Sequence, residues 1–327
     1  MKTRRAARQT CWIMLIAPLC GAVAATPFPV SDQNPITRGF YHPLPAPARW
    51  DSSDGGSQVL LTVANTTNMN RRGGERLLVD AESTEMRWLW SEDLDSNWRV
   101  RASLPIVHYG GGILDPVIDG FHELFGLDQG SRPNRPDDEL AIEYAAADAS
   151  IRVDRSYTGI GDLSVEFGRR LLSQRTLAVS VWSGIELPTG NASKLTGNGA
   201  LDTGLWFCSD WRPSSRLSFS NTVGGALQGS GDLLNDRRAP WVGFANMTAR
   251  WDATPQLYLQ AQFDFHDSYL KSTRIPLLGS ATILTVGGGY RTLSGWRMGI
   301  SVSEDFKYNT SPDVVFQLPL RPPFGLE

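Results

Sequence analysis

Cysteine is nearly absent from this sequence, and so are long apolar runs. Two of the three cysteines, Cys11 and Cys20, lie within the first 25 residues, which leaves Cys208 alone in the rest of the 327-residue chain. A single cysteine can form neither an internal disulfide nor a cysteine-based metal site. After residue 25 no stretch stays apolar for about 18 residues, which excludes a transmembrane helix.

Residues 1–25 have the composition of a secretory signal peptide. A basic start precedes an apolar run over 11–23 that is too short to span a membrane as a helix, and Ala22-Val23-Ala24 offers a small-residue cleavage site. We therefore expect cleavage near this site and export of the remaining chain to the outer membrane. Two weaker alternatives are lipidation at Cys20 and twin-arginine export at Arg4-Arg5.

Lysine is scarce in the exported chain, and the net charge is negative. The only lysines after residue 25 are Lys194, Lys271 and Lys307. Without the four basic residues of the signal, 27 of the 31 basic residues remain against 34 acidic ones. A nucleic-acid partner is therefore not expected.

Alternating hydrophobicity is the dominant pattern of the rest of the chain. From Gln256 to His266, apolar residues at odd positions alternate with polar or amphipathic residues at even positions. A period of two predicts a strand with one apolar and one polar face, and its length suits a membrane crossing. Twelve such segments are predicted strands, at 57–65, 76–91, 97–108, 161–172, 176–187, 200–211, 215–227, 239–252, 256–267, 281–292, 295–303 and 312–319.

The connections between these segments alternate in length. Short ones lie at 93–96, 173–175, 212–214, 253–255 and 293–294, and long ones at 66–75, 109–160, 188–199, 228–238, 268–280 and 304–311. Tight turns on one side and long loops on the other are typical of outer-membrane barrels. The predicted fold class is all-β, an antiparallel transmembrane β-barrel of about twelve strands with one long helix-bearing loop, and a soluble β-sandwich is the alternative.

Proline determines the character of the segment before the first strand. Six prolines between Thr26 and Trp50 exclude a helix or a central strand. We expect residues 26–56 to form an extended segment that lies in the periplasm or inside the lumen, and residues 57–327 to form the barrel.

Tryptophans gather beside the short connections. Five of them flank four of the five predicted tight turns, namely Trp90, Trp98, Trp211, Trp251 and Trp296. An indole ring and its N–H group suit the two phases that meet at a membrane interface. These residues therefore predict an aromatic girdle in contact with outer-membrane lipid.

Charged residues follow the opposite parity and are expected to line the lumen. This row contains six arginines and seven acidic residues, namely Glu85, Arg87, Arg99, Arg101, Asp162, Glu166, Arg170, Glu186, Asp202, Asp210, Arg250, Asp264 and Arg297. The near balance predicts ion-paired networks, which either fill the barrel or border a path for a solute. The candidate lumen or constriction residues are Arg87, Arg99, Arg101, Asp115, Asp119, His122, Glu123, Glu166, Arg250, Asp264, His266 and Arg297.

The connection 109–160 is much longer than a strand connection needs to be, and such loops are usually functional. Apolar residues at three- and four-residue spacing predict an amphipathic helix over 113–125, ended by Gly126. Weak alternation over 139–154 predicts a hairpin that extends the neighbouring strands. We expect the 110–136 part to fold as a constriction or lid.

The same loop carries a family resemblance. The runs Gly111-Gly112-Ile113-Leu114-Asp115 and Ile118 to Leu127, with Arg132, resemble the central motif of a bacterial family described only as domain of unknown function 3187. Gln33-Asn34-Pro35 and Asp80-Ala81-Glu82 are similar to other parts of its pattern. The resemblance implies an outer-membrane-type barrel and no established activity.

Catalytic and metal sites have little support in the sequence. His122-Glu123 lacks a second nearby histidine, so no metal and no cofactor are expected. Asp264 and His266 share a strand face and could form a hydrolase constellation with a serine such as Ser301 or Ser303. Their lumen parity argues against a lipid substrate.

Three functions remain as hypotheses. The first is a narrow channel or binding protein for a small polar solute, assembled into the outer membrane by the barrel assembly machinery. The second is an envelope enzyme that acts on lipid or lipopolysaccharide. The third is a structural barrel whose loops bind a partner.

Overall fold

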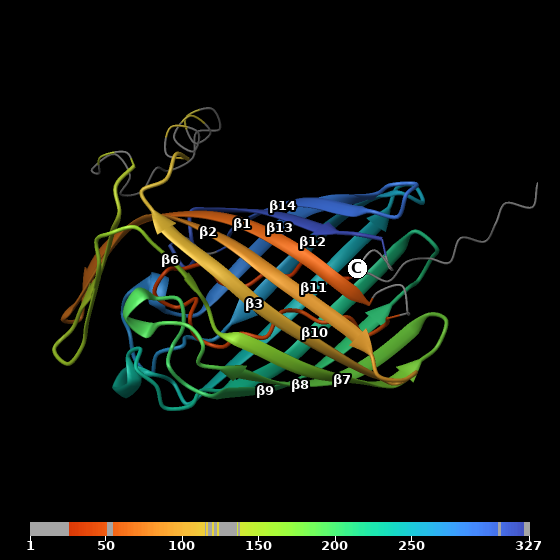
Figure 1. Ribbon diagram of the computed structural model, residues 1–327, viewed down its shortest axis with the longest axis horizontal. Helices are drawn as coiled ribbons and strands as arrows, with labels where there is room; N and C mark the ends of the chain where they lie inside the picture. The colour runs from red at the N-terminus through yellow and green to blue at the C-terminus, as the bar shows by residue number, and fades with distance from the viewer. Residues whose placement is uncertain are drawn as a thin grey trace, which may run out of the picture.

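Twelve antiparallel strands close into a barrel in the computed structural model, which describes residues 26–50, 55–114, 116, 120, 123, 136, 138–306 and 309–323 (Figure 1). The predicted twelve-strand barrel is therefore confirmed. In order around the ring the strands are β1 (Gly56–Arg72), β2 (Glu75–Asp93), β3 (Trp98–Gly110), β7 (Leu163–Ser173), β8 (Leu177–Leu187), β9 (Asp202–Trp211), β10 (Leu217–Leu227), β11 (Trp241–Asp252), β12 (Leu257–His266), β13 (Ala281–Arg291), β14 (Arg297–Asp305) and β15 (Val314–Arg321). β1 closes the ring by pairing with β15, where Leu60 lies opposite Pro319.

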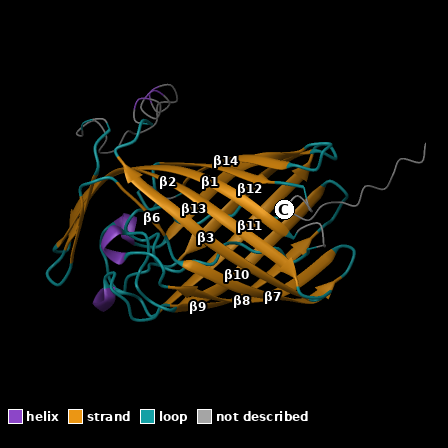
Figure 2. Cartoon of the chain, viewed as in Figure 1, coloured by secondary structure: helices purple, strands orange, loops and turns teal. Residues whose placement is uncertain are grey.

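Apart from the turn between β1 and β2, short and long connections lie at opposite ends of the barrel (Figure 2). We name these ends the turn end and the loop end. Three short strands continue the sheet at the loop end: β4 (Ala141–Ala145) pairs with β2 and with β5 (Ser150–Val153), and β6 (Tyr157–Ile160) pairs with β3. The hairpin expected over 139–154 is therefore present, and β2 is the strand that it extends.

The long connection predicted at 66–75 is wrong. β1 continues to Arg72 and pairs with β2 along its whole length, so that only Gly73 and Gly74 form the turn. Both glycines have positive φ, 58° and 82°. A two-residue hairpin turn needs this conformation, which glycine adopts without strain.

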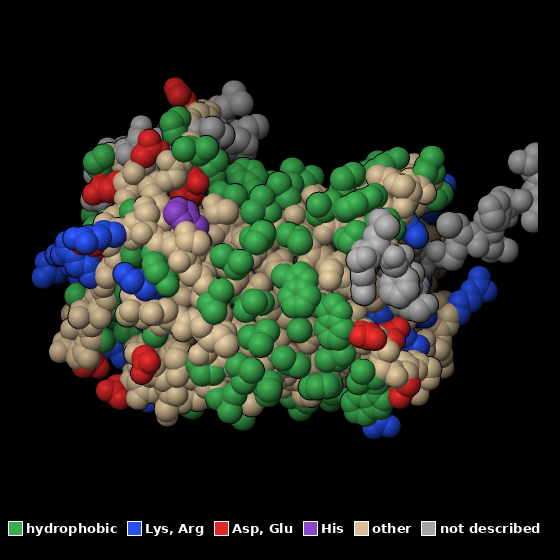
Figure 3. Space-filling view, viewed as in Figure 1, with side chains coloured by type: hydrophobic (Ala, Val, Ile, Leu, Met, Phe, Trp, Pro, Cys, Tyr) green, Lys and Arg blue, Asp and Glu red, His purple; other side chains and the backbone are tan. Residues whose placement is uncertain are grey.

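The alternation of each strand places apolar side chains outside and polar side chains inside. On β12, Leu259 and Phe263 are 50% and 41% exposed, whereas Gln262 and Asp264 are 0% and 5% exposed. A soluble sandwich would bury the apolar row instead, so the sandwich alternative is wrong. The exposed rows form an apolar belt on the barrel wall, one face of which is shown in Figure 3.

Helical structure is sparse in the described part of the chain. The helical elements with described bounds are three 3-10 turns, at Ala192–Lys194, Asn235–Arg237 and Pro276–Leu278. No helix among the described residues is long and apolar enough to cross a membrane. The helix predicted over 113–125 lies mostly outside the described residues and stays a prediction, as does the signal peptide at 1–25.

The segment from Thr26 to Trp50, which we name the N-terminal segment, runs through the interior of the barrel. It starts at the turn end, where Thr26 lies near Gln58 and Arg321. It rises to a turn at the loop end, where Asn34 Nδ2 donates to the carbonyl oxygen of Leu277 (2.6 Å). It then returns to Trp50, whose carbonyl oxygen accepts from Arg170 (2.6 Å). The chain therefore fills the lumen with an up-and-down strap before the first strand begins.

A buried apolar cluster closes the loop end. Ile36 and Phe40, in the turn of the N-terminal segment, pack in one cluster with residues of β2, β3, β4 and the loops, including Leu77, Val79, Tyr109, Ile142, Tyr144, Leu195, Leu233, Tyr269 and Leu278. Burying one such side chain stabilises the fold by about 1.5–3 kcal/mol. The cluster therefore anchors the turn of the segment far from the end at which the segment enters.

Candidate functional site in the barrel lumen

Side chains of the barrel wall hold the N-terminal segment through its backbone carbonyl groups. Gln262 donates to Phe28 O (3.1 Å), Ser180 donates to Pro47 O (3.3 Å), and Gln228 donates to Tyr41 O (3.2 Å). The prolines of the segment have no N–H group and cannot complete a strand ladder. The segment is therefore held by separate side-chain contacts and lies outside the sheet.

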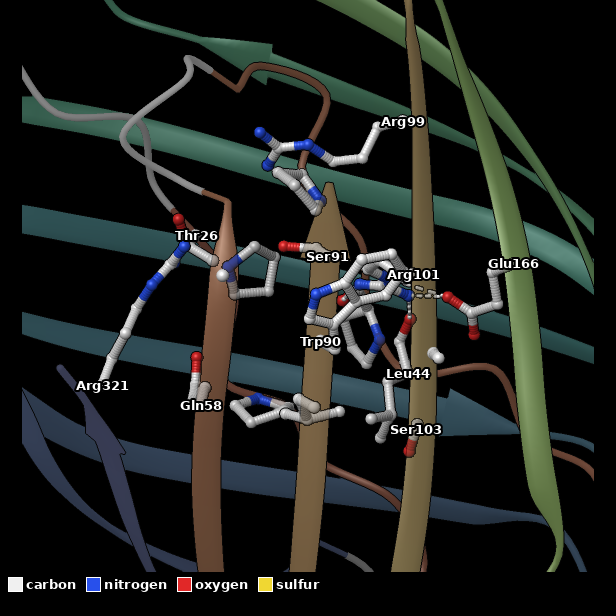
Figure 4. A pocket seen from close by; sticks show the side chains of 17 residues that line it. Thr26, Leu44, Gln58, Trp90, Ser91, Arg99, Arg101, Ser103, Glu166 and Arg321 are labelled. Atoms are coloured by element: carbon white, nitrogen blue, oxygen red, sulfur yellow. Dashed lines mark hydrogen bonds and ion pairs between the residues drawn. The ribbon is translucent and has the colours of Figure 1, made fainter. Parts of the chain in front are cut away.

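Arg101 on β3 makes the most connected of these contacts (Figure 4). Its guanidinium donates to Leu44 O (3.0 Å), to Pro45 O (3.1 Å) and to Glu166 on β7 through Nε (2.7 Å). It also lies over the ring of Trp182, 4.8 Å from the ring centroid. One side chain thus joins the wall to the descending half of the segment while Glu166 balances its charge.

Two paired glycines make room for Tyr41. Gly184 on β8 lies opposite Gly204 on β9. A Cβ atom at Gly184 would lie 2.3 Å from Tyr41 Oη, and one at Gly204 would lie 3.1 Å from the Tyr41 ring. The absence of side chains at this pair therefore creates the groove in which the phenol lies.

An aromatic cluster packs against the descending half of the segment. Trp182 and Trp206, both 0% exposed, stack with their ring centroids 6.5 Å apart, and Trp50 meets Trp182 edge-on at 5.5 Å. Ala46 and Cys208 belong to the same buried cluster, and the Cys208 thiol faces the backbone of Ala46. The single cysteine among the described residues therefore lies directly beside the N-terminal segment.

The turn of the segment is also held by charge. Arg38 forms an ion pair with Glu85 on β2, and Arg87 donates to the same carboxylate (2.6 Å). Arg87 donates in addition to Ser103 (3.1 Å). This buried network ties the segment to β2 and β3, and its hydrogen bonds compensate the cost of burying the charges.

Asp32 and two histidines form a polar cluster near the loop end. Asp32 accepts from Thr37 Oγ1 (2.8 Å) and lies 3.6 Å from His266 Nε2. His42 Nδ1 lies 3.1 Å from the hydroxyl of Tyr269. Among the described residues, neither ring nitrogen of His266 bonds a serine hydroxyl, so the hydrolase constellation is not assembled.

Acidic residues at the loop end brace the loops. Asp162 accepts from the backbone N–H groups of Gly190 (2.7 Å) and Asn198 (2.9 Å), and burial raises its pKa. Asp202 accepts from Asn198 Nδ2 and Gly229 N, both at 2.6 Å. These carboxylates replace backbone partners that the loops lack.

A second network holds the β4–β5 hairpin outside the ring. Arg237 donates to Asp148 (2.7 Å), Glu75 (3.0 Å) and the hydroxyl of Tyr144 (2.7 Å). The hydrogen bond from Arg237 lowers the pKa of Asp148, and burial together with Glu75 raises the pKa of Tyr144. In the described part of the chain, no group of three or more His, Cys, Asp or Glu side chains is placed to hold a metal ion.

A family model described as "Protein of unknown function (DUF3187)" matches residues 4–324. The chain belongs to the DUF3187 family. The lumen described above is therefore that of a DUF3187 barrel, and the resemblance carried by the 111–132 motif is confirmed.

The fold of this DUF3187 barrel is similar to those of several solved structures. The COG4313 outer membrane channel from Pseudomonas putida F1 aligns with a TM-score of 0.52 at 10% identity, over 83% of this chain and 98% of that chain. A KdgM porin (TM-score 0.45, 7% identity, 82% and 99%) and a NanC porin (TM-score 0.47, 10% identity, 80% and 98%) are more distant. No curated protein matches the chain. The similarity to the COG4313 channel concerns the fold alone.

The structure places most of the candidate lumen residues on the inner face of this DUF3187 barrel. The residues that are buried or half-buried there are Arg87, Arg99, Arg101, Glu166, Arg250, Asp264, His266 and Arg297. Asp115, Asp119 and His122 lie outside the described residues, and Glu123 is exposed. Contact of any of them with a solute stays a prediction, and so does the 110–136 constriction.

The five girdle tryptophans divide into two groups. Trp98, Trp211 and Trp251 are 40%, 51% and 48% exposed at the turn end, while Trp90 and Trp296 are half-buried. Sequence reasoning missed the exposed Trp88 and Trp241 and the interior pair Trp182 and Trp206. Alternation along the strand could have identified Trp182 as an interior residue, because it has the same parity as the lumen residues Ser180 and Glu186.

Proposed function

We propose that this protein is an outer-membrane channel for small polar solutes, and that its N-terminal segment closes the lumen until the segment moves. The observation that carries the proposal is that most of the segment Thr26–Trp50 is buried inside a twelve-stranded barrel whose inner wall is polar and charged. In this account the signal peptide directs export, the assembly machinery inserts the barrel, and lipid surrounds the apolar belt.

The character of the contacts supports a movable segment. Wall donors such as Arg101, Ser180 and Gln317 bond one or two backbone carbonyl oxygens each. Water or a polar solute offers the same acceptors, so exchange of partners leaves no wall donor unsatisfied. A strand of the sheet would instead lose a cooperative ladder.

The turn of the segment and the half that follows it are held by different kinds of contact. The turn at Asn34–Phe40 packs in the loop-end cluster and carries the Arg38–Glu85 ion pair. The descending half is held near the turn end by Arg101 and Arg170. We infer that opening begins at the turn end, where both halves of the segment enter the lumen.

A one-residue substitution tests this function. Ala46→Cys places a second thiol beside Cys208, so that oxidation ties the segment to β9. In planar lipid bilayers the reduced variant is expected to conduct like the unmodified protein, the oxidised variant is expected to stop conducting, and reduction is expected to restore conductance. The double variant Ala46→Cys, Cys208→Ala cannot cross-link and controls for the substitution.

Two results would count against the channel. Equal conductance of the oxidised and reduced Ala46→Cys protein would show that the segment does not gate the lumen. No conductance in any state would favour the third hypothesis, a barrel permanently filled by its own segment with a structural or partner-binding role. The filled lumen is the observation that supports this structural or partner-binding role as the alternative function.

A further inference from the structure

Positive charge gathers at the tip of the hairpin that β1 and β2 form at the loop end. Arg71 and Arg72 are the last two residues of β1, Gly73 and Gly74 form the turn, and Arg76 follows at the start of β2. All three arginines are exposed. The hairpin projects from the loop end of the barrel (Figure 1), so its tip stands in reach of molecules outside the lumen.

Two of these arginines face each other across the hairpin. Arg71 lies directly opposite Arg76 in the register of the two strands. Side chains in such positions share one face of the sheet with their Cβ atoms about 4.5–5.5 Å apart, and like charges there are destabilising. In the described part of the chain neither guanidinium forms an ion pair or a hydrogen bond. An anion that lies between them would relieve this repulsion.

A fourth arginine reaches the tip from the loop between β12 and β13. A Cβ atom at Gly73 would lie 2.7 Å from Cδ of Arg274, so the side chain of Arg274 lies against the turn. Like the other three, Arg274 is exposed and has no anionic partner among the described residues. We name these four residues the basic tip, namely Arg71, Arg72, Arg76 and Arg274.

The carboxylate nearest in sequence to the basic tip is already satisfied. Glu75 is 5% exposed and accepts from Arg237 (3.0 Å), Tyr144 (2.7 Å) and Thr273 (3.1 Å). It also accepts from the backbone N–H group of Arg274 (2.8 Å). These bonds join the hairpin to the loop and thereby hold the four arginines in one place.

The acidic residues of the β4–β5 hairpin beside the tip are paired elsewhere. Asp148 pairs with Arg237 (2.6 Å), and Glu143 and Asp154 pair with Arg152 (3.4 and 3.1 Å). None of the three forms an ion pair with the basic tip. The tip is therefore a positively charged surface on a chain whose net charge is −3.

We propose that the basic tip binds the phosphate groups of lipopolysaccharide in the outer leaflet of the outer membrane. The long connections of outer-membrane barrels face outward, which places the tip on the side of the membrane that carries this lipid. A guanidinium group binds a phosphate through two parallel hydrogen bonds, and clustered phosphates complement clustered arginines. The inference goes beyond the proposed gating and does not rest on it.

The shape of the tip suits a broad partner in the same membrane. A Cβ atom at Gly74 would meet nothing within 4 Å, so the turn is open and forms no pocket for a small free ion. Single contacts of exposed arginines are weak. The barrel and the lipopolysaccharide share one membrane, however, and the high effective concentration allows several weak contacts to act together.

Native mass spectrometry of the barrel refolded in detergent tests this surface. The probe is phosphorylated rough lipopolysaccharide, and the control ligand is the same lipopolysaccharide after chemical dephosphorylation. In a titration we expect the dephosphorylated form to bind at least about tenfold more weakly, because several arginines each lose a charged partner. Phosphatidylglycerol, a lipid with a single phosphate, is expected to bind more weakly as well.

Matched arginine variants locate the surface. Arg71→Gln and Arg76→Gln are each expected to weaken the binding of phosphorylated lipopolysaccharide about fivefold. Arg216→Gln removes the same charge from an exposed arginine at the turn end, and it is expected to leave the binding unchanged. A gel shift between heated and unheated samples verifies that each variant is a folded barrel.

The proposal is overturned if dephosphorylated lipopolysaccharide or phosphatidylglycerol binds as tightly as the phosphorylated probe. It is also overturned if the probe does not bind, or if Arg216→Gln weakens binding as much as Arg71→Gln. Failure of the proposed gating is separate from these outcomes. An Ala46→Cys protein that conducts equally when oxidised and reduced still binds the probe if the basic tip is the binding surface.

Discussion

Arg38 in the turn of the N-terminal segment and Glu85 on β2 form an ion pair in which the two side chains are only 4% and 2% exposed. The partners are 47 residues apart in the chain, and Arg87 shares the carboxylate. The pair therefore fixes the segment against the wall at the end opposite its entry.

Removing the carboxylate of Glu85 is expected to release this turn. Glu85→Gln leaves Arg38 and Arg87 buried without their anion, and breaking a buried pair costs about 3–5 kcal/mol. The measurement is the rate of trypsin cleavage after Arg38 in the folded barrel, which should rise strongly. Glu143→Gln breaks an exposed pair with Arg152 and should cost no more than about 1 kcal/mol. Similar effects of the two variants would contradict the anchoring role.

Filling the glycine groove is expected to displace Tyr41. Gly184→Ala places a Cβ atom 2.3 Å from Tyr41 Oη, and overpacking of this kind typically costs about 1–3 kcal/mol. Hydrogen exchange of the backbone at 41–50 should accelerate. Adding Tyr41→Ala removes the shortest contact and leaves the one with Glu166 Cγ (2.9 Å), so the double variant should be less destabilised than the sum of the two single variants. Strict additivity would show that the two side chains do not meet.

The apolar belt is expected to be sensitive to charge according to depth. Met247 is 60% exposed and lies midway along β11 between Trp241 and Trp251. Met247→Arg should lower the free energy of unfolding in lipid vesicles by about 2–4 kcal/mol, and Leu257→Arg at the turn end by about 0–1 kcal/mol. Guanidinium titrations of the two variants measure this difference. Equal costs at the two positions would mean that the belt does not face a bilayer.

Acid is expected to loosen the β4–β5 hairpin. The hydrogen bond from Arg237 lowers the pKa of Asp148 below its ordinary value of 3.8. The stabilisation is therefore complete above the ordinary value and is lost as the pH falls through the lowered pKa. Exchange of the Ala146 amide, which bonds Ala149 O (2.8 Å), should quicken in that range after correction for intrinsic rates. Asp148→Asn should lack this component, and an unchanged profile in that variant would refute the assignment.

The sequence predicts those parts of the fold that depend on local periodicity. Strand β12 alternates without interruption, so its two faces and its length follow from the residues alone. The loop-end half of β1 cannot be predicted in this way, because Thr66, Thr67 and Asn68 are polar on both faces. Its strand structure depends on pairing with β2. The weak alternation over 139–154 predicts the hairpin of β4 and β5, but it does not show that β4 pairs with β2.

The candidate site follows the same division. Parity is enough to place Arg101 and Glu166 on the inner wall, but not to show that Arg101 also holds Leu44 and Pro45. Prolines exclude regular structure from the N-terminal segment without indicating what replaces it. Its position depends on contacts such as that of Phe28 with Gln262, which is 234 residues away.

The central claim is that the N-terminal segment occupies the lumen, and the Ala46→Cys protein tests it most directly. The measurement is mass spectrometry of peptides from isolated outer membranes after mild oxidation and alkylation of free thiols. We predict a disulfide between residue 46 and Cys208 in nearly all molecules. Two freely alkylated thiols in the folded, membrane-embedded barrel would contradict the account, because the segment would then lie elsewhere.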